Sequence, residues 1–428
     1  MNEQNIVKIR KLNMKLYPTY KTLSWDYLFF YTINFLFLTQ VKGISPADVV
    51  LIDSFYYFFA VFSQIPATFT IEFLGKKNSI VLANILNCLY MVVLIFSRNL
   101  FHLIIAELLS AFAFAIKESA EPSLLNESIP PTSYRDKIFA RISSRGLSKY
   151  YVINAISKVI SGILYEVNPY IPIILSLSTL IIVTILSLFF IEPIEKKKIK
   201  YEPFTQIKDL GAAFKYILKS ERIKSLLLFS AIMIGLFSIL INYEVCMLED
   251  LSISAKYLGI IFAVLSIISA FAAKKQESFH SRFTNRSLAV LGGIASISCI
   301  IAGIFGIISK VYPLCILVVI LIYAIRHFIK GLYYPLIEKY LGNFTNEKID
   351  TKIYTADSFF KSIASAIFGI FASLLLDRLD SAICMIIVGI VFGLIILFAL
   401  SFMQKRVGLD PSLYSKEDLK YDKNKIAR

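Results

Sequence analysis

The sequence holds few of the side chains from which metal and redox centres are built. Among 428 residues there are five cysteines and three histidines, and no two cysteines form a CxxC pair. The cysteines are odd in number and almost all lie in apolar stretches, which favours buried free thiols over disulfides. A clustered zinc site and a dithiol redox centre are therefore excluded, and we predict no metal site.

Motifs for nucleotide chemistry are also missing. The chain has no GxxxxGK[ST] loop and no GxGxxG after a strand pattern, so neither an ATPase nor a dinucleotide-binding domain is predicted. No constellation of metal ligands or nucleophiles falls on one helical face. We therefore expect a protein that is not an enzyme and that uses no ATP or other cofactor. Any work that it performs must draw on a gradient of protons or of another ion.

Charged residues are scarce and apolar residues are abundant. Charged side chains make up 18% of the chain and apolar side chains 57%, whereas soluble proteins average about 25% and about 45 to 50%. One or two soluble cores are too small to bury this much apolar side chain. The sequence thus predicts an integral membrane protein, and its spans must be helices because lipid leaves no backbone group unpaired.

Long apolar segments recur along the chain, each near the roughly 20 residues that a helix needs to cross a bilayer. A polar stretch rich in lysine separates them into two groups of six. The predicted fold is all-α, with twelve transmembrane helices in two six-helix bundles. The segments lie at about residues 22–41, 47–68, 79–96, 101–121, 147–166, 170–191, 223–243, 257–273, 287–308, 311–331, 355–376 and 382–403.

A trace of internal duplication supports two bundles. Residues 114–122, FAIKESAEP, align with residues 327–335, HFIKGLYYP, and share an isoleucine, a lysine and a proline. The match places the fourth span on the tenth in the same orientation, as a parallel pseudo-twofold repeat requires. The predicted regions are a cytoplasmic N-terminal segment (1–21), an N-terminal bundle (22–191), a basic cytoplasmic linker (192–222), a C-terminal bundle (223–403) and a cytoplasmic C-terminal tail (404–428).

Basic residues are distributed unevenly around these spans. The formal net charge is +15, and most of the lysines and arginines fall on cytoplasmic loops and tails if the chain starts in the cytoplasm. This positive-inside asymmetry predicts a multi-pass protein of the cytoplasmic (inner) membrane with both termini in the cytoplasm. Since the basic side would face anionic headgroups, we expect the lipid bilayer as its partner and not nucleic acid.

The connection between the second and third spans carries a family signature. It reads IPATFTIEFLGKKNSIVL over residues 65–82, with an acid at Glu72, a glycine at Gly75 and a basic pair at Lys76 and Lys77. This pattern resembles the loop motif of the major facilitator superfamily, with threonine in place of the usual first glycine and glutamate in place of aspartate. Together with the span count, the linker and the repeat, the whole chain resembles a bacterial transporter of this superfamily.

The resemblance implies two bundles that rock about a midplane cavity, in a commonly monomeric protein with a small-molecule substrate. It also implies that the loop braces the cytoplasmic side of one conformational state. Glu72 would lie beside the start of the eleventh span, gain from the positive end of that helix, and bond Lys361 in one state only, which biases the equilibrium. Alternatively, Lys76 and Lys77 only mark the cytoplasmic side.

The sequence departs from the drug/proton antiporters of this superfamily. In their fourth span these often carry arginine and then glycine four residues later, whereas this chain has Glu107 and Ala111. Their fifth span often has a Gly-Pro pair in a glycine-rich stretch, but this chain keeps only Gly162. The subgroup is therefore not assigned.

Charges inside the spans are the main candidates for a transport site, because inserting each one costs about 2.5 to 3.5 kcal/mol. Glu107 and Lys158 both lie about 10 Å from the outer boundary at 1.5 Å per residue. We predict that they form an ion pair lining the cavity, with Glu107 as proton acceptor; the alternative is a purely structural pair. Asp53 is a further candidate for binding substrate or a proton, unless it only reaches the outer interface. Asp26 is expected at the membrane interface.

Three long cations lie near the cytoplasmic ends of the fourth and tenth spans, namely Lys117, Arg326 and Lys330. Such side chains usually extend to the lipid headgroups; the alternative is that they face the cavity. Aromatic residues crowd the first two spans. They either hold a lipophilic or cationic compound by stacking and cation–π contact or pack against helices and lipid.

The leading hypothesis is a secondary active transporter that works by alternating access, in proton-coupled export of a lipophilic or cationic compound. A second hypothesis is a facilitator-type importer of a nutrient or anionic solute, recognised by Lys158, Arg326 and Lys330. A third is a membrane sensor or scaffold that keeps a transporter fold without transport. Only the scaffold would tolerate loss of the charges inside the membrane.

Overall fold

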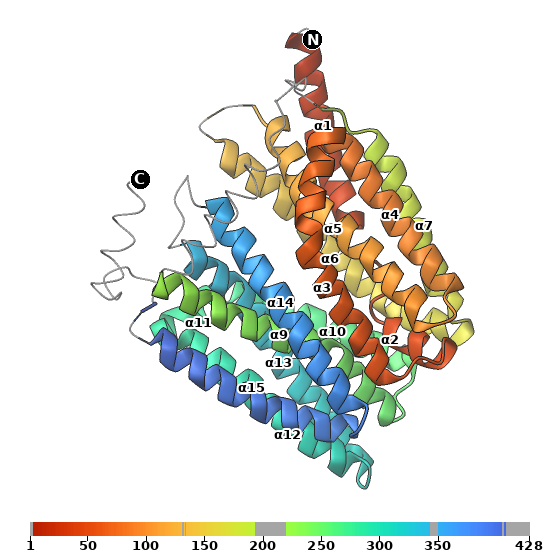
Figure 1. Cartoon of the computed structure of the whole chain (residues 1–428), viewed down its shortest axis with the longest axis vertical. Helices are drawn as coiled ribbons and strands as arrows, with labels where there is room; N and C mark the ends of the chain where they lie inside the picture. Colours follow the sequence, from red (N-terminus) through yellow and green to blue (C-terminus); the bar gives the residue numbers. More distant parts are fainter. Residues whose placement is uncertain are drawn as a thin grey trace. The chain divides into compact units, whose positions relative to one another are not determined.

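The computed structural model describes residues 3–130, 132, 134–192, 220–342, 350–404 and 406–407. In this part of the chain all regular structure is helical, as predicted (Figure 1). The elements are α1 (Glu3–Ser24), α2 (Asn34–Leu36), the π-helix η1 (Phe37–Val41), α3 (Pro46–Leu74), α4 (Lys76–Phe96), α5 (Leu100–Ser128), α6 (Arg135–Val167), α7 (Tyr170–Leu188), α9 (Glu221–Asp250), α10 (Ala255–Lys274), α11 (Gln276–Phe283), the 3-10 helix η2 (Thr284–Arg286), α12 (Ser287–Ser309), the 3-10 helix η3 (Pro313–Cys315), α13 (Ile316–Gly342), α14 (Asp350–Leu376) and α15 (Ser381–Met403).

Ten helical stretches among the described residues are long and apolar enough to cross a membrane. They confirm a multi-pass, all-α membrane protein, and they correspond to ten of the twelve predicted spans. The two other predicted segments, 22–41 and 147–166, lie in the region from α1 to η1 and in α6. α6 is a continuous helix, but it starts with several basic residues and carries Lys158 further along, so its apolar character is diluted.

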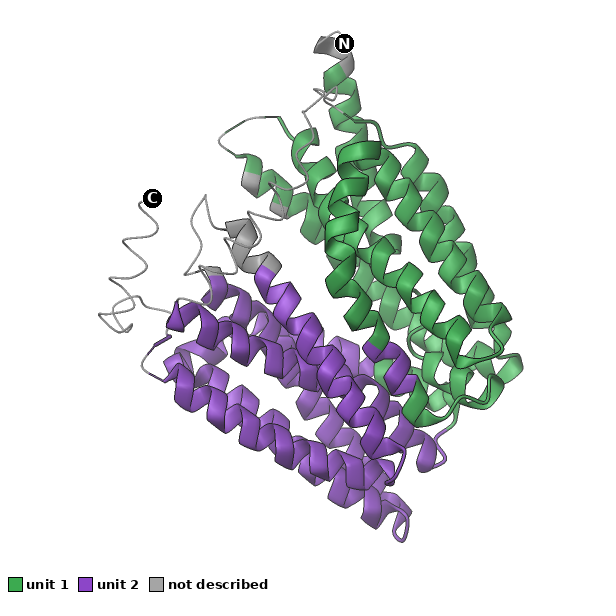
Figure 2. Cartoon of the chain, in the orientation of Figure 1, with its two compact units in different colours: residues 1–48, 55–202, 254–263 green, residues 49–54, 203–253, 264–428 purple. Residues whose placement is uncertain are grey.

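The chain divides into two compact units, which Figure 2 shows in different colours. Unit 1 comprises residues 1–48, 55–202 and 254–263, and unit 2 comprises residues 49–54, 203–253 and 264–428. The division is not a simple one into halves, because residues 49–54 belong to unit 2 and residues 254–263 belong to unit 1. The bundle limits 22–191 and 223–403, with the linker and the two terminal segments, stay predictions.

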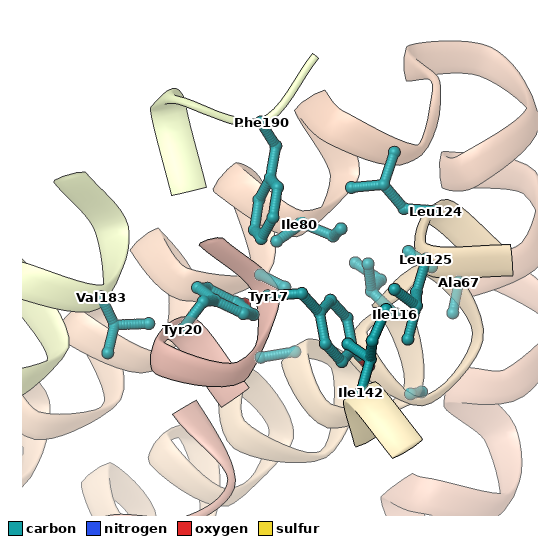
Figure 3. Close-up of a cluster of buried hydrophobic side chains, with 14 of the residues drawn as sticks. Tyr17, Tyr20, Ala67, Ile80, Ile116, Leu124, Leu125, Ile142, Val183 and Phe190 are labelled. Carbon is teal, nitrogen blue, oxygen red and sulfur yellow. The ribbon is translucent and has the colours of Figure 1, made fainter. Parts of the chain in front are cut away.

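Unit 1 is organised around α4, which packs against α5 and α7, while α1 packs against α6. Buried apolar side chains from these helices form one cluster, which Figure 3 shows in close-up. Tyr17 and Tyr20 of α1 belong to it, together with Ile80 of α4, Leu124 of α5 and Val183 of α7. The cluster therefore ties the first helix into the unit.

Helical structure begins earlier than the sequence predicts. The polar segment expected over residues 1–21 is helical from Glu3, and one face of α1 carries the tyrosines that enter the cluster. The difference arises because basic residues on the other face of α1 lower the mean hydropathy of the segment. A one-sided apolar pattern still suffices to pack a helix against its neighbours.

The first predicted span, 22–41, is not one continuous helix. α1 ends at Ser24, residues 25–33 form bends and turns, and helical structure resumes at Asn34. Phe29 adopts a positive φ of 68°, a conformation that a bulky side chain rarely adopts. The apolar run thus continues through a break in the helix, which hydropathy alone does not reveal.

Unit 2 is built on pairs of long apolar helices. α12 packs against α15 and α13, and α9 packs against α14 and α15. α9 is almost wholly buried along its length. The repeat segments 114–122 and 327–335 lie in α5 and α13, and each helix holds the shared proline within it.

Candidate functional site

A buried carboxylate organises the charges of unit 1. Glu121 of α5 is fully buried, and its two oxygens accept from the hydroxyl of Tyr20 at 2.9 Å and from the ammonium of Lys21 at 2.5 Å. Lys117, one turn earlier on α5, lies 3.8 Å from the same carboxylate. A carboxylate buried this deeply needs such partners, because an unpaired buried charge is strongly unfavourable.

Lys117 also stabilises the end of α1. Its ammonium donates to the backbone carbonyl of Ser24, the last residue of that helix. The final carbonyls of a helix have no partner within the helix, and a lysine side chain can satisfy them. With only 4% of its surface exposed, Lys117 is an interior cation, so the expectation that it extends to the headgroups does not hold.

Unit 2 holds a second buried ion cluster, at Glu244 of α9. The carboxylate accepts from Arg326 of α13 at 2.6 and 2.7 Å and contacts the His327 imidazole at 3.0 Å. The guanidinium also lies over the Tyr323 ring, 4.6 Å from its centroid. Arg326 is buried, so it too fails to extend to the headgroups, while Lys330 is half-buried.

Glu121 and Glu244 are central to these clusters, although neither is predicted from the sequence as a site residue. Glu121 is the last residue of the predicted span 101–121, and Glu244 directly follows the predicted span 223–243. At such positions a carboxylate is expected to belong to a loop. The helices continue to Ser128 and to Asp250, so both carboxylates are inside. The available signal was the four-residue spacing of Lys117 and Glu121 on one helix face.

The three residues predicted for substrate or proton coupling have different surroundings. Glu107 is buried on α5, and Lys158 is half-buried on α6. The ion pair between them stays a prediction. Asp53 of α3, in unit 2, accepts a hydrogen bond of 2.7 Å from the Asn242 side chain of α9, so its carboxylate has a fixed polar partner.

Asp26 lies in the break of the first predicted span. Its carboxylate accepts from the Tyr27 backbone N–H at 2.9 Å and from the Tyr150 hydroxyl of α6 at 2.9 Å, and it interacts electrostatically with Lys158. The sequence treats Asp26 as an interfacial acid because it lies near one end of an apolar run. The structure instead surrounds it with groups from α6 and from the interrupted helix.

The loop between α3 and α4 is a tight connection around Gly75. This residue ends α3 and precedes α4 with φ 86° and ψ 164°, a region that is essentially open only to glycine. The Lys76 ammonium pairs with Glu127 of α5, and the Lys77 backbone N–H donates to the Glu192 carboxylate at 3.1 Å. The loop is thus held by contacts within unit 1.

The other members of the predicted gate lie apart in the chain. Glu72 is exposed near the end of α3, and Lys361 pairs with Asp357 one turn earlier on α14. A bond between Glu72 and Lys361 would join the two units, and it stays a prediction.

Comparison with known proteins places this arrangement in a family. The model of the Major Facilitator Superfamily matches residues 23–343, while no curated protein matches the chain. Similar solved structures include the nucleoside transporter NupG, with a TM-score of 0.71 at 11% identity, covering 93% of this chain and 100% of that chain. A D-xylose-proton symporter has a TM-score of 0.66 at 10% identity, with 93% and 97% covered.

A third similar structure is a bacterial homologue of the human lysosomal transporter Spinster. It has a TM-score of 0.66 at 13% identity and covers 92% of this chain and 96% of that chain. At such identities the likeness establishes the fold alone, whereas the family model covers most of the sequence. The chain therefore belongs to the Major Facilitator Superfamily and is a multi-pass membrane transporter for a small-molecule substrate.

Proposed function

We propose that this transporter couples the movement of protons to the export of a lipophilic or cationic compound by alternating access. The observation that carries the proposal is the presence of two carboxylates inside unit 1, on α5 and in the helix break, beside a concentration of tyrosines. Tyr27 lies within electrostatic range of both Glu107 and Asp26. Carboxylates inside a membrane are costly and usually serve transport.

A proton carrier must change its charge when its surroundings change. A buried carboxylate is stable as an anion only while a cation or several donors accompany it. We infer that Glu107 and Lys158 form such a couple, in which departure of the ammonium leaves Glu107 to take up a proton. Asp53, held by Asn242, is the second acid that we assign to substrate or proton binding.

The aromatic side chains of the first two spans supply a surface for the compound itself. Tyr27 is stacked on Tyr31 and on Tyr90, with ring centroids 5.8 and 4.9 Å apart. Faces of such rings attract cations and bury apolar groups. This combination of carboxylates and ring faces supports a lipophilic or cationic compound over an anion.

The loop around Gly75 is assigned to conformational control. Its contacts with Glu127 and Glu192 fix the loop on unit 1, and we assign to Glu72 the response to conformational state. A bond from Glu72 to Lys361 in one state would then bias the exchange. In that state Lys361 would exchange Asp357 for Glu72.

Import of an anionic solute is the second candidate, and one observation weakens it. It requires Arg326 as a recognition group, but Glu244 already neutralises the guanidinium. Lys158 and Lys330 would remain for the anion. We therefore rank it below export of a cation.

Proton flux in liposomes tests the proposal. The purified protein is reconstituted with a pH-sensitive dye inside, and pools of lipophilic cations, neutral compounds and anions are added. We expect cation-dependent proton flux in the native protein and a loss of about tenfold or more in Glu107→Gln and Lys158→Met, as for removal of an essential charge. Matched controls are Glu277→Gln and Lys256→Met, both exposed in the structure, which should retain native flux.

Three outcomes would contradict parts of this proposal. Equal flux in the native protein and both charge variants would remove Glu107 and Lys158 from the coupling site. Flux driven by anions and not by cations would favour the importer. A protein that binds no compound pool and moves no protons would favour a sensor or scaffold. The direction of transport follows from the same assay in inverted membrane vesicles, where export appears as uptake.

A further inference from the structure

The break at residues 25–33 falls within the predicted first span, 22–41, and therefore at membrane depth in that span. Residues 25–33 precede the helical stretch 34–41, which ends at Val41 and spans about 12 Å at 1.5 Å per residue. The hydrocarbon core of a bilayer is about 30 Å thick. The turns therefore interrupt the helix near the middle of the membrane, where interruptions are rare.

Such a break cannot face lipid. Non-helical backbone at membrane depth is tolerated only where it is buried in protein or lines a water-filled space. Part of this segment is nevertheless accessible, because Trp25 and Tyr31 are 41% and 44% exposed and Asp26 is partly exposed. Charged residues within a span face the protein interior or a water-filled cavity, so the partly exposed Asp26 is within reach of a solute from water.

The break is held in place by groups outside it. The Lys117 ammonium satisfies the Ser24 carbonyl at the end of α1. The Tyr27 hydroxyl bonds the Asn87 side-chain oxygen and the Ser110 hydroxyl, both at 2.8 Å. These contacts anchor the segment on α4 and α5, so the protein itself fixes its geometry.

The Asp26 carboxylate is held by two donors in a residue that is partly exposed. The Tyr27 N–H and the Tyr150 hydroxyl hold it at 2.9 Å each, and Lys158 acts on it electrostatically. Tyr31 lies close to the same carboxylate. Lys117 also lies within electrostatic range of Asp26, but its ammonium is engaged by Glu121 and by the Ser24 carbonyl, so Lys158 is the lysine that would compete with a further cation for this carboxylate.

Ring faces border this carboxylate on two sides. Tyr31 forms the accessible end of the stack that continues through Tyr27 to Tyr90. Trp25 lies against Tyr150, with ring centroids 6.0 Å apart. The Lys21 ammonium lies over the Trp25 ring, 4.6 Å from its centroid, which shows that a ring of this segment already attracts a cation.

We propose that the helix break at residues 25–33 is the binding site for the charged group of a monovalent organic cation, with Asp26 as its counter-ion and the rings of Trp25 and Tyr31 against its apolar part. Lys158 competes with the cation for Asp26. The proposal rests on the proposed export of a lipophilic or cationic compound, and it assigns the recognition of that compound to a site that does not include Glu107 or Asp53.

The chain contains its own reporter for this site. Trp25 is the single tryptophan of the sequence and lies inside the break, so the intrinsic tryptophan fluorescence of the full-length protein monitors these residues alone. Tetraphenylphosphonium and tetraphenylborate have the same shape and opposite charge. We expect the phosphonium ion to change the fluorescence saturably, and the borate ion to produce no saturable change.

Two substitutions should change the affinity in opposite directions. Asp26→Asn removes the counter-ion and should weaken binding of the phosphonium ion about tenfold or more, while Asp26→Glu should restore most of it. Lys158→Met removes the competitor and should strengthen binding about threefold or more. The control is Asp48→Asn, at the start of α3 beside Ser45, which should bind like the native protein. A misfolded variant does not bind more tightly, so tighter binding by Lys158→Met cannot be explained by a structural effect of the substitution.

Equal affinity in the native protein and Asp26→Asn would overturn the proposal, as would equal responses to the two ions or weaker binding in Lys158→Met. Its failure is separable from failure of the proposed function. Native proton flux in Asp26→Asn would leave proton-coupled export standing while removing this site. If binding depends on Asp26 but the protein moves no protons, the binding site stands and proton-coupled export is removed.

Discussion

At the residue scale, each unit contains a buried carboxylate whose charge is compensated by neighbouring side chains. Glu121 has Tyr20, Lys21 and Lys117, and Glu244 has Arg326. Such clusters contribute little net stability compared with apolar residues of the same shape, but removing one partner leaves an uncompensated buried charge. Their members should therefore be sensitive to single substitution and tolerant of paired substitution.

The cluster at Glu244 makes this testable. Glu244→Gln leaves the Arg326 guanidinium, 2% exposed, without its counter-ion, and it should destabilise the protein by about 3 to 5 kcal/mol. The double variant Glu244→Leu with Arg326→Met removes both charges and should recover most of that loss. Thermal unfolding in detergent measures both.

Lys310→Met provides the comparison. It breaks the ion pair with Asp380, in which the lysine is 44% exposed, and such pairs contribute about 0 to 1 kcal/mol. A double variant less stable than Glu244→Gln would contradict the account of the cluster, and a large effect at Lys310 would show that the assay does not separate buried from exposed pairs.

At the element scale, the connection between α3 and α4 depends on backbone geometry. Gly75 is the only residue between the two helices, and its φ of 86° suits no side chain well. The Glu192 carboxylate accepts from the Lys77 N–H in the first turn of α4, where the helix end attracts negative charge. Glycine leaves room for this carboxylate, since a Cβ at residue 75 would come within 3.0 Å of the Glu192 carboxyl carbon.

Gly75→Ala should destabilise the protein by about 1 to 3 kcal/mol, because alanine is strained at this φ and displaces Glu192. The matched change is Gly293→Ala in α12, where an added Cβ meets nothing within 4 Å. There alanine should be neutral or should stabilise by up to about 1 kcal/mol. If both variants unfold at the same temperature as the native protein, the loop is not constrained as described.

At the whole-molecule scale, charge distribution predicts orientation. The positive-inside asymmetry predicts that both ends of the chain and the lysine-rich linker lie on the cytoplasmic side. Alkaline phosphatase folds only after export, so a fusion after Lys198 should be inactive and a fusion after Arg98 should be active. Activity after Lys198 would reverse the orientation and, with it, the assignment of export.

Much of the fold was predictable because hydropathy is a local property. Ten predicted spans match helices, and the loop at Gly75 indicated the family that the comparison confirms. The break at residues 25–33 was not predictable, since its residues are as apolar as those of a helix. The extent of α9 was not predictable because Glu244 is charged and therefore indicates the end of a span. Only the tertiary structure shows that Arg326 pairs with it inside the protein.

The residues of the candidate site also differ in whether local sequence or tertiary contacts reveal them. Glu107 and Lys158 were recognisable as charges inside apolar runs, and the structure places them on α5 and α6 with the pairing still to be tested. Asp26 was expected only at the membrane interface, because its surroundings depend on Tyr150, which lies far along the chain. No local pattern contains that information.

The sequence by itself determined that the chain enters a membrane, that it is helical, and which family it resembles, because the transfer of side chains into lipid depends on composition along short segments. The tertiary structure alone decided which buried charges meet, where the first helix breaks, and which side chains surround Asp26. These depend on contacts between residues about a hundred positions apart, and the free energy of a buried charge is fixed by the neighbours that such contacts bring to it.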